Sequence, residues 1–118
     1  MLPVNFEDVA DAARRVAPHV HRTPVLRSRR LDTLVGADLF LKCENLQRIG
    51  AFKARGAHNA VLSLGDAEAA RGVVTHSSGN HAAALSLAAA TRGIRADIVM
   101  PEAQAAMSRT MSGIGRSA

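Results

Sequence analysis

The most constraining feature of this sequence is a stretch of roughly thirty residues in which two short apolar runs flank one alanine-rich segment. The runs are Gly72 to His76 and Ala96 to Met100, and the segment between them extends to about Arg92 and closes at Gly93. A parallel strand pair needs a crossover of about a dozen residues or more, commonly a helix. The spacing therefore predicts a strand–helix–strand unit with a parallel sheet, which places the chain in the α/β class with helices flanking open parallel-type sheets.

The residues before this unit predict a series of shorter elements. Asn5 is suited to cap a helix over 6–17, and Ser28 to cap a second short helix that Gly36 closes. Apolar residues alternate between Asp38 and Glu44, which predicts a strand with Cys43 in the core. Other expected elements are an extended segment at 23–26, a loop over 45–51, and a helix from about Lys53 to Leu64 that ends at Gly65.

A short polar stretch in the middle of the chain suggests a domain boundary. The sequence turns polar between Asp66 and Arg71, so we expect a boundary there, with 1–70 and 71–118 as parts of two domains. The segment after Met107 shows neither a helical nor a strand period. Because a doubly wound sheet needs more strands, we expect both domains to be incomplete and the chain to end within its architecture.

Composition excludes several classes of protein. The chain is 47% apolar and 21% charged, which is typical of a soluble globular protein rather than a disordered one. It has no apolar run of membrane-spanning length, and early acidic residues at 7, 8 and 11 argue against a signal peptide, so a cytoplasmic protein is expected. A single cysteine allows no internal disulfide.

A formal charge of +5 raises the alternative of nucleic-acid binding. Only 3% of the residues are aromatic, so stacking platforms for single strands are scarce. The arginines are mostly spread along the chain, which favours a solvated basic surface over a specific nucleic-acid site. The histidines at 19, 21, 58 and 81 show no metal-ligand spacing, so no metal site is expected.

The first candidate for chemistry is a lysine at the start of a predicted helix. Lys53 follows Phe52 directly and opens the helix after the Gly50 loop. A lysine amine attacks a carbonyl only when neutral, and both the positive end of a helix and partial burial disfavour its charged form. The position suits Schiff-base chemistry with Phe52 as a shield against water, although a structural lysine at a helix start remains the alternative.

The second candidate is the loop Ser77–His81, which joins the end of a predicted strand to the start of a predicted helix. Ligands bind at such junctions in open α/β sheets, where backbone N–H groups and the helix dipole favour anions. Gly79 permits close backbone approach, and Ser77, Ser78 and Asn80 add polar groups. A carboxylate or phosphate is the expected guest, with a simple capped helix start as the alternative.

Together the two loops resemble a known family. The stretch Leu41–Ala57, followed by Val74–His81, is similar to the serine/threonine dehydratase and serine racemase family, and Thr23–Leu26 matches its usual early motif. The resemblance runs from about His21 to Pro101. It implies fold type II of the pyridoxal-phosphate enzymes, which is like the β subunit of tryptophan synthase.

The resemblance also implies roles for individual residues. Pyridoxal 5'-phosphate would be attached covalently to Lys53, with Phe52 beside its ring and Asn80 bonded to its phenolic oxygen. The loop Ser77 to His81, with Ser78, Gly79 and Asn80 between them, would hold the substrate carboxylate. Lys53 would remove the α-proton, and Ser78 matches the position of a hydroxyl that returns a proton on the opposite face in racemases.

The departures from the family concern two small substitutions and the length. Ala51 stands where a serine is common, and Ala82 where a glycine is common; both are tolerable. The family's glycine-rich phosphate loop, its contact to the pyridine nitrogen and its cation ligands would all lie downstream of these residues. We therefore expect a fragment that is inactive alone.

Three functions are therefore weighed from the sequence. The first is a serine/threonine ammonia-lyase that forms a 2-oxo acid and ammonia from a small hydroxy-amino acid. The second is an amino-acid racemase of the same family. The third is a non-catalytic fragment stabilised by association with another chain, since an unfinished sheet leaves apolar surface and strand edges uncovered. No membrane or specific nucleic-acid partner is expected, and full-length members of the family are expected to be homo-oligomers.

Overall fold

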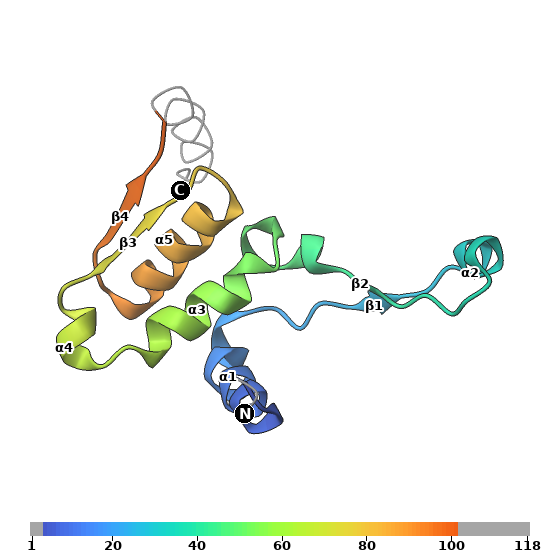
Figure 1. Cartoon of the computed structure of the whole chain (residues 1–118), viewed down its shortest axis with the longest axis horizontal. Coiled ribbons are helices and arrows are strands. Elements are labelled where there is room, and N and C mark those ends of the chain that lie inside the picture. The colour runs from blue at the N-terminus through green and yellow to red at the C-terminus, as the bar shows by residue number, and fades with distance from the viewer. Residues whose placement is uncertain (1–3, 102–118) are drawn as a thin grey trace, which may run out of the picture.

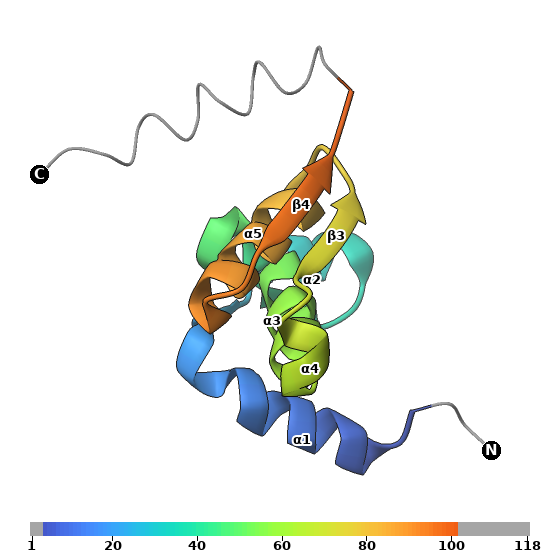
Figure 2. The ribbon, with the colours of Figure 1, turned by 90° about the vertical axis from the view of Figure 1, so that its left-hand side faces the viewer.

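The predicted strand–helix–strand unit is present in the computed structural model, which describes residues 4–101. Strand β3 (Val73–His76) leads into helix α5 (Asn80–Arg92), which returns to strand β4 (Ala96–Val99). The strands pair in parallel from Val73 opposite Ala96 to His76 opposite Val99. Helix α5 lies along one face of this two-stranded sheet (Figures 1 and 2). The α/β class expected from the sequence is confirmed.

The core forms where helix α3 (Lys53–Ser63) packs on α5. Small residues at the contact let the two helices approach closely, and apolar residues of η3, the strands and the turn before β4 cover the contact. The buried cluster is Ala57, Val61, Ala84, Leu85 and Ala88, against which Ile49, Val73, Ile94 and Ile98 pack. The predicted alanine-rich helix is thus the central element of the fold.

The two core helices run in the same direction. At one end Ile49, just before α3, packs on the cluster that contains α5 residues. At the other end Arg92, the last residue of α5, donates from Nη1 to the Val61 carbonyl oxygen at 2.5 Å. The starts of both helices, at Lys53 and Asn80, therefore lie at the same end of the pair (Figure 1).

Helix α1 (Phe6–Val16) begins as the sequence predicts. The Asn5 side chain accepts from the Asp8 amide at 3.0 Å, and the Asp8 carboxylate accepts from the Asn5 amide at 2.9 Å, which forms a capping box. A 3-10 turn, η1 (Ala17–His19), follows the helix. Val16 is the buried residue of α1, while Phe6 is 82% exposed, so most of the apolar face of α1 is uncovered.

The elements between residues 25 and 42 form an arm that projects from the rest of the chain (Figure 1). Strands β1 (Val25–Leu26) and β2 (Leu41–Lys42) pair antiparallel and support helix α2 (Arg29–Val35). Helix α2 is capped at its start by the Ser28 side chain and ends at left-handed Gly36, as predicted.

The strand expected over Asp38–Glu44 is wrong in extent, since only Leu41 and Lys42 pair. The Asp38 carboxylate binds Arg27, and the Leu39 amide donates to Asp32 at 2.8 Å, so these residues are tied to the arm rather than to a sheet.

Helix α3 ends at Ser63 with Leu64 as its C-cap, close to the predicted end. The polar stretch after Gly65 forms helix α4 (Asp66–Ala69), and the Gly65 amide donates to Glu68 at 3.0 Å at its start. Two further expectations need correction. The segment expected as a loop over 45–51 contains two 3-10 turns, η2 (Glu44–Leu46) and η3 (Arg48–Gly50). Cys43 is half-buried rather than part of the core.

The predicted domain boundary falls between α3 and β3. Helices from both sides of it share the buried cluster, and the division into 1–70 and 71–118 stays a prediction. The segment after Met107, for which no regular structure was expected, lies outside the described residues. Within 4–101, no helix has the length and apolar character needed to cross a membrane.

Substitution of a core alanine tests this packing. Ala88 is fully buried between α3 and α5, whereas Ala90 on the same helix is exposed. We expect Ala88→Leu to lower the free energy of unfolding by about 1–3 kcal/mol, because extra methylenes in a packed core force strain. Ala90→Leu is the matched control and is expected to change it by less than about 0.5 kcal/mol. Urea unfolding measures both, and equal midpoints would contradict the proposed core.

Candidate functional site

Lys53 is the first residue of α3 and lies on the surface of the described chain. Its Nζ is 5.2 Å from the centre of the Phe52 ring, and Phe52 is itself 60% exposed. The partial burial and the shielding expected from the sequence are therefore wrong for residues 4–101. The neighbouring Ala51 and Ala54 are buried, so it is the Lys53 side of this end of α3 that is open.

The segment before Lys53 has an unusual backbone. Ile49 has φ 60° and Gly50 has φ 67°, so two consecutive residues are left-handed. Glycine adopts this conformation freely, but a β-branched residue does so rarely, at a cost of about 1–3 kcal/mol. Ile49 is half-buried against the core cluster, and that packing offsets part of the cost. Backbone strain of this kind is concentrated at functional sites.

The loop Ser77–His81 sits at the end of β3 as predicted. The Ser77 amide continues the strand ladder by donating to the Val99 carbonyl oxygen at 3.0 Å, and the Ser77 hydroxyl accepts from the Gly79 amide at 3.4 Å. Helix α5 begins at Asn80, directly after Gly79. Ser78, Asn80 and His81 are exposed, so their polar groups are open to a ligand.

The two helix starts that carry these residues differ from those of α1 and α2. Neither α3 nor α5 has a side chain that caps its first amides, whereas Asn5 and Ser28 cap the other two. At the start of α3, the Ala54 and Arg55 amides donate to the carbonyl oxygens of Ala51 and Phe52. It is therefore the start of α5 whose first amides, together with the helix dipole, favour an anion. Because Lys53 starts α3 at the same end of the α3–α5 pair, an anionic ligand at the start of α5 would lie at the end of the fold that carries Lys53.

The structure thus brings Lys53 and the Ser77–His81 loop to the same end of the fold without direct contact. Among residues 4–101, no hydrogen bond or ion pair joins Lys53 to that loop. A ligand between them is one arrangement that would use both. The described part of the chain contains no group of three His, Cys, Asp or Glu side chains able to hold a metal ion.

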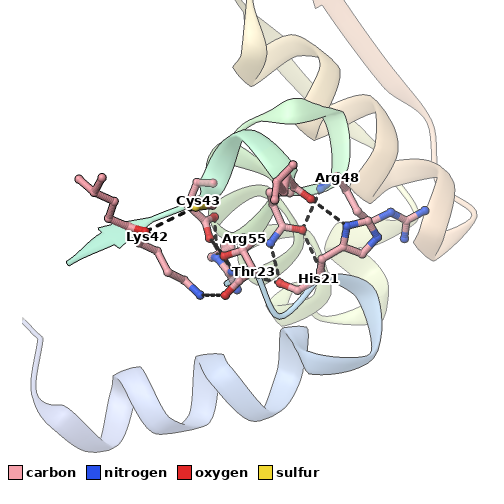
Figure 3. Close-up of polar contacts among 10 residues, drawn as sticks. His21, Thr23, Lys42, Cys43, Arg48 and Arg55 are labelled. Carbon is pink, nitrogen blue, oxygen red and sulfur yellow. Dashed lines mark hydrogen bonds and ion pairs between the residues drawn. The ribbon is translucent and has the colours of Figure 1, made fainter. Parts of the chain in front are cut away.

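A polar network behind Lys53 was missed by the sequence reasoning (Figure 3). Arg55, two residues after Lys53, binds the Glu44 carboxylate with two hydrogen bonds, and the buried Thr23 hydroxyl donates to the same carboxylate at 2.5 Å. Buried Gln47 accepts from the His21 amide and donates to the His21 carbonyl oxygen, both at 2.8 Å. Lys42 and Glu44 were interpreted only as one face of the predicted strand, so the part of Glu44 in this network was not predicted.

The network changes the acidity of Glu44. Hydrogen bonding from Arg55 is the largest cause that lowers the pKa of Glu44, and the Thr23 hydroxyl and the charge of Lys42 lower it further, so that it reaches about 2. Burial opposes this shift. The carboxylate is therefore ionised throughout the range in which the protein is handled.

A carboxyl whose pKa is lower in the folded state stabilises the fold above its unfolded pKa, and that stabilisation is lost as pH falls through the folded pKa. We expect the free energy of unfolding to fall between about pH 4.5 and pH 2 by about 1–2 kcal/mol through Glu44, allowing for partial exposure of the pair. Urea unfolding at stepped pH measures this. Glu44→Gln is expected to remove that part of the acid slope, and an unchanged slope would contradict the assignment.

Comparison with known proteins identifies the class to which this arrangement belongs. Residues 16–113 match the family described as pyridoxal-phosphate dependent enzyme. The chain belongs to this family, and the resemblance drawn from its two loops is confirmed.

Similar proteins narrow the relationship. The chain is 62% identical over 94 residues to a serine racemase of Arabidopsis thaliana, covering 80% of the chain and 28% of the relative. It is 58% identical over 96 residues to β-hydroxyaspartate dehydratase of Paracoccus denitrificans, covering 81% and 30%. The solved structure of maize serine racemase matches with a TM-score of 0.83 and 50% identity, over 93% of the chain and 35% of that protein. The chain thus spans about a third of the length of these relatives, and its fold is part of fold type II.

The residues present fit pyridoxal phosphate in part. An exposed primary amine at Lys53 is the group that the cofactor's aldehyde needs, and the uncapped start of α5 is suited to a nearby anion. Phe52 lies next to Lys53, where its ring can contact a flat cofactor. The described residues therefore include an amine and a helix start of the kinds that a pyridoxal-phosphate site needs.

Proposed function

We propose that this chain forms part of a pyridoxal-phosphate-dependent enzyme that acts on small hydroxy-amino acids, with Lys53 as the residue that carries the cofactor. The observation that supports it most is the placement of Lys53 and the Ser77–His81 loop at the starts of α3 and α5, on one end of the core. This geometry puts an amine and a loop suited to an anion at the same end of the core.

Each candidate residue then has a chemical task. Lys53 would hold the cofactor covalently and would accept the proton from Cα of the substrate. Backbone amides at Gly79 to His81 bind the substrate carboxylate at the start of α5. Asn80 would donate a hydrogen bond to the cofactor, and Phe52 would pack beside it. The cofactor itself supplies an electron-withdrawing ring that stabilises negative charge at Cα.

The first reaction proposed is elimination, in which the β-hydroxyl leaves and the products are a 2-oxo acid and ammonia, and the alternative is racemisation at Cα. The similarity to a β-hydroxyaspartate dehydratase supports a lyase, and the similarity to serine racemases supports racemisation to the same degree. The exposed hydroxyl of Ser78 favours the racemase alternative, because racemisation needs a proton donor on the face opposite Lys53. Serine, threonine and hydroxyaspartate are the substrates proposed.

Product analysis separates these reactions. The purified protein is incubated with pyridoxal phosphate and L-serine, L-threonine or L-threo-3-hydroxyaspartate, and ammonia, 2-oxo acid and D-amino acid are measured. Elimination predicts equal amounts of ammonia and 2-oxo acid, whereas racemisation predicts the D-enantiomer without ammonia. Ser78→Ala is expected to suppress the second reaction more than the first. Absence of any reaction in a protein of the relatives' full length would contradict the proposal.

The 118-residue chain on its own is expected to bind the cofactor weakly and to release no ammonia. Lys53 is exposed, and no described segment encloses it, so water would reach any bound substrate. Ammonia release from L-serine by this chain alone would contradict the expectation.

A non-catalytic role through association is the second candidate. The arm carries exposed apolar side chains, among them Leu34 at 79%, Phe40 at 66% and Leu26 at 55%. An apolar surface of this kind is typical of a contact with another chain or segment. Size-exclusion chromatography of the 118-residue chain tests it: a clean monomer at high concentration would count against this role.

A further inference from the structure

The Glu44–Arg55 pair closes the segment that carries Lys53. Glu44 starts η2 and Arg55 lies in the first turn of α3, so the pair joins two points eleven residues apart along the chain. Arg55 Nε donates to Glu44 Oε2 at 2.9 Å and Arg55 Nη2 to Glu44 Oε1 at 2.7 Å. Such two-point pairing fixes orientation as well as distance.

Arg55 faces away from the candidate cofactor side. Residues two apart on a helix lie about 200° apart around its axis, so Lys53 and Arg55 point in nearly opposite directions. A contact that holds Arg55 therefore fixes the rotation of the first turn of α3 and, with it, the direction of Lys53. Helix α3 has no side-chain cap that could do this instead.

The enclosed segment needs such support. It contains the left-handed Ile49, and strained residues persist only where their surroundings hold them in place. Arg55 Nη2 also donates to the His21 carbonyl oxygen at 3.1 Å, and Gln47 pairs with the amide and carbonyl of His21. The chain before β1 thereby binds both sides of the closed segment (Figure 3).

We propose that Glu44 and Arg55 are positioning residues, which form a clasp that holds the Lys53 amine toward the Ser77–His81 side of the fold. The inference rests on the proposed function of Lys53. The clasp itself does not touch the cofactor or the substrate: it determines how fast and how selectively Lys53 can react.

Two variants and one control test the clasp in the chain as it stands. Glu44→Gln keeps the shape but removes the charge, and Arg55→Lys keeps the charge but removes the two-point contact. The control is Asp66→Asn, since Asp66 is fully exposed and pairs with Arg92 at 3.4 Å away from Lys53. Thermal unfolding first establishes that each variant is folded at the assay temperature.

The first readout is independent of the cofactor. Hydrogen exchange of the amides at 48–54 is expected to speed up about tenfold in Glu44→Gln and Arg55→Lys, while the amides in the buried part of α5 keep their rates. The control is expected to leave 48–54 unchanged. Unchanged exchange in both clasp variants would overturn the proposal whatever Lys53 does.

The second readout is the rate at which pyridoxal phosphate labels Lys53, trapped by borohydride and quantified by mass spectrometry. A free peptide of residues 48–58 gives the rate of an unpositioned lysine. The native chain is expected to react about tenfold faster than the peptide, and both clasp variants to fall toward the peptide rate. Variants that label as fast as the native chain would overturn the clasp. If Lys53 in the native chain is labelled no faster than in the peptide, the proposed function is rejected instead. That comparison is made before any variant is measured, so the two failures are distinguishable.

Discussion

Lys53→Arg is expected to abolish the absorbance band that pyridoxal phosphate gives when it is bound to a lysine. Arginine keeps the positive charge and a similar length, but it provides no primary amine that can be neutral at ordinary pH. In a protein of the relatives' full length, we expect turnover of the amino acid to fall by at least about 10³-fold, since both the covalent anchor and the proton acceptor are lost. Absorbance titration with the cofactor measures the first effect and ammonia release the second.

The sequence offers a matched control for this substitution, because its lysines are Lys42 and Lys53. Lys42 Nζ donates to the Thr23 carbonyl oxygen at 2.5 Å, and an arginine can make the same contact. Lys42→Arg is therefore expected to keep the absorbance band. Loss of the band in Lys42→Arg with its retention in Lys53→Arg would transfer the anchor to Lys42.

Among the glycines of residues 4–101, Gly72 is the one whose replacement by alanine is expected to cause the largest loss of stability. Gly72 has φ 78°, and a Cβ there would lie 2.7 Å from the Arg95 carbonyl oxygen, a backbone atom that also accepts from the Val73 amide. Strand β3 or β4 would have to shift at the start of the parallel pair. We expect the free energy of unfolding to fall by about 2–4 kcal/mol, from left-handed strain together with the clash.

Gly93→Ala separates these two causes. Gly93 has φ 73° at the end of α5, and no atom lies within 4 Å of a Cβ added there. Gly93→Ala therefore adds only the strain of a Cβ against its own left-handed backbone, which costs about 1–2 kcal/mol. Urea unfolding of both variants gives the difference. If Gly93→Ala is as destabilising as Gly72→Ala, the close approach of Gly72 to Arg95 contributes nothing.

Strong local signals made the central part of the fold predictable from sequence. The strand–helix–strand unit has glycines at its turns and an unbroken helical segment, and its β3, α5 and β4 were predicted to within a residue or two. The caps at Asn5 and Ser28 were predicted because a short polar side chain before an apolar period has few other uses. The two candidate loops were identified because each carries polar residues at the start of a predicted helix. The family match confirms the resemblance that they carry.

Contacts between distant residues were not predictable in this way. The Glu44–Arg55 pair and the Gln47–His21 pairing join segments that are 11 and 26 residues apart, and no local period encodes them. Alternation over Asp38–Glu44 suggested a longer strand, because the side-chain bonds from Arg27 and Asp32 that hold this stretch have no sequence signature. The roles of the site residues, the cytoplasmic location and the homo-oligomeric state stay predictions.

The central claim is that Lys53 is the amine that carries pyridoxal phosphate. Peptide mapping tests it most directly: the chain is mixed with the cofactor, reduced with borohydride and digested, and the label on each amine is quantified. We predict that the label is found mainly on the peptide containing Lys53, with little on Lys42 or the N-terminal amine. An even distribution over the three amines, or a preference for Lys42, would contradict the account.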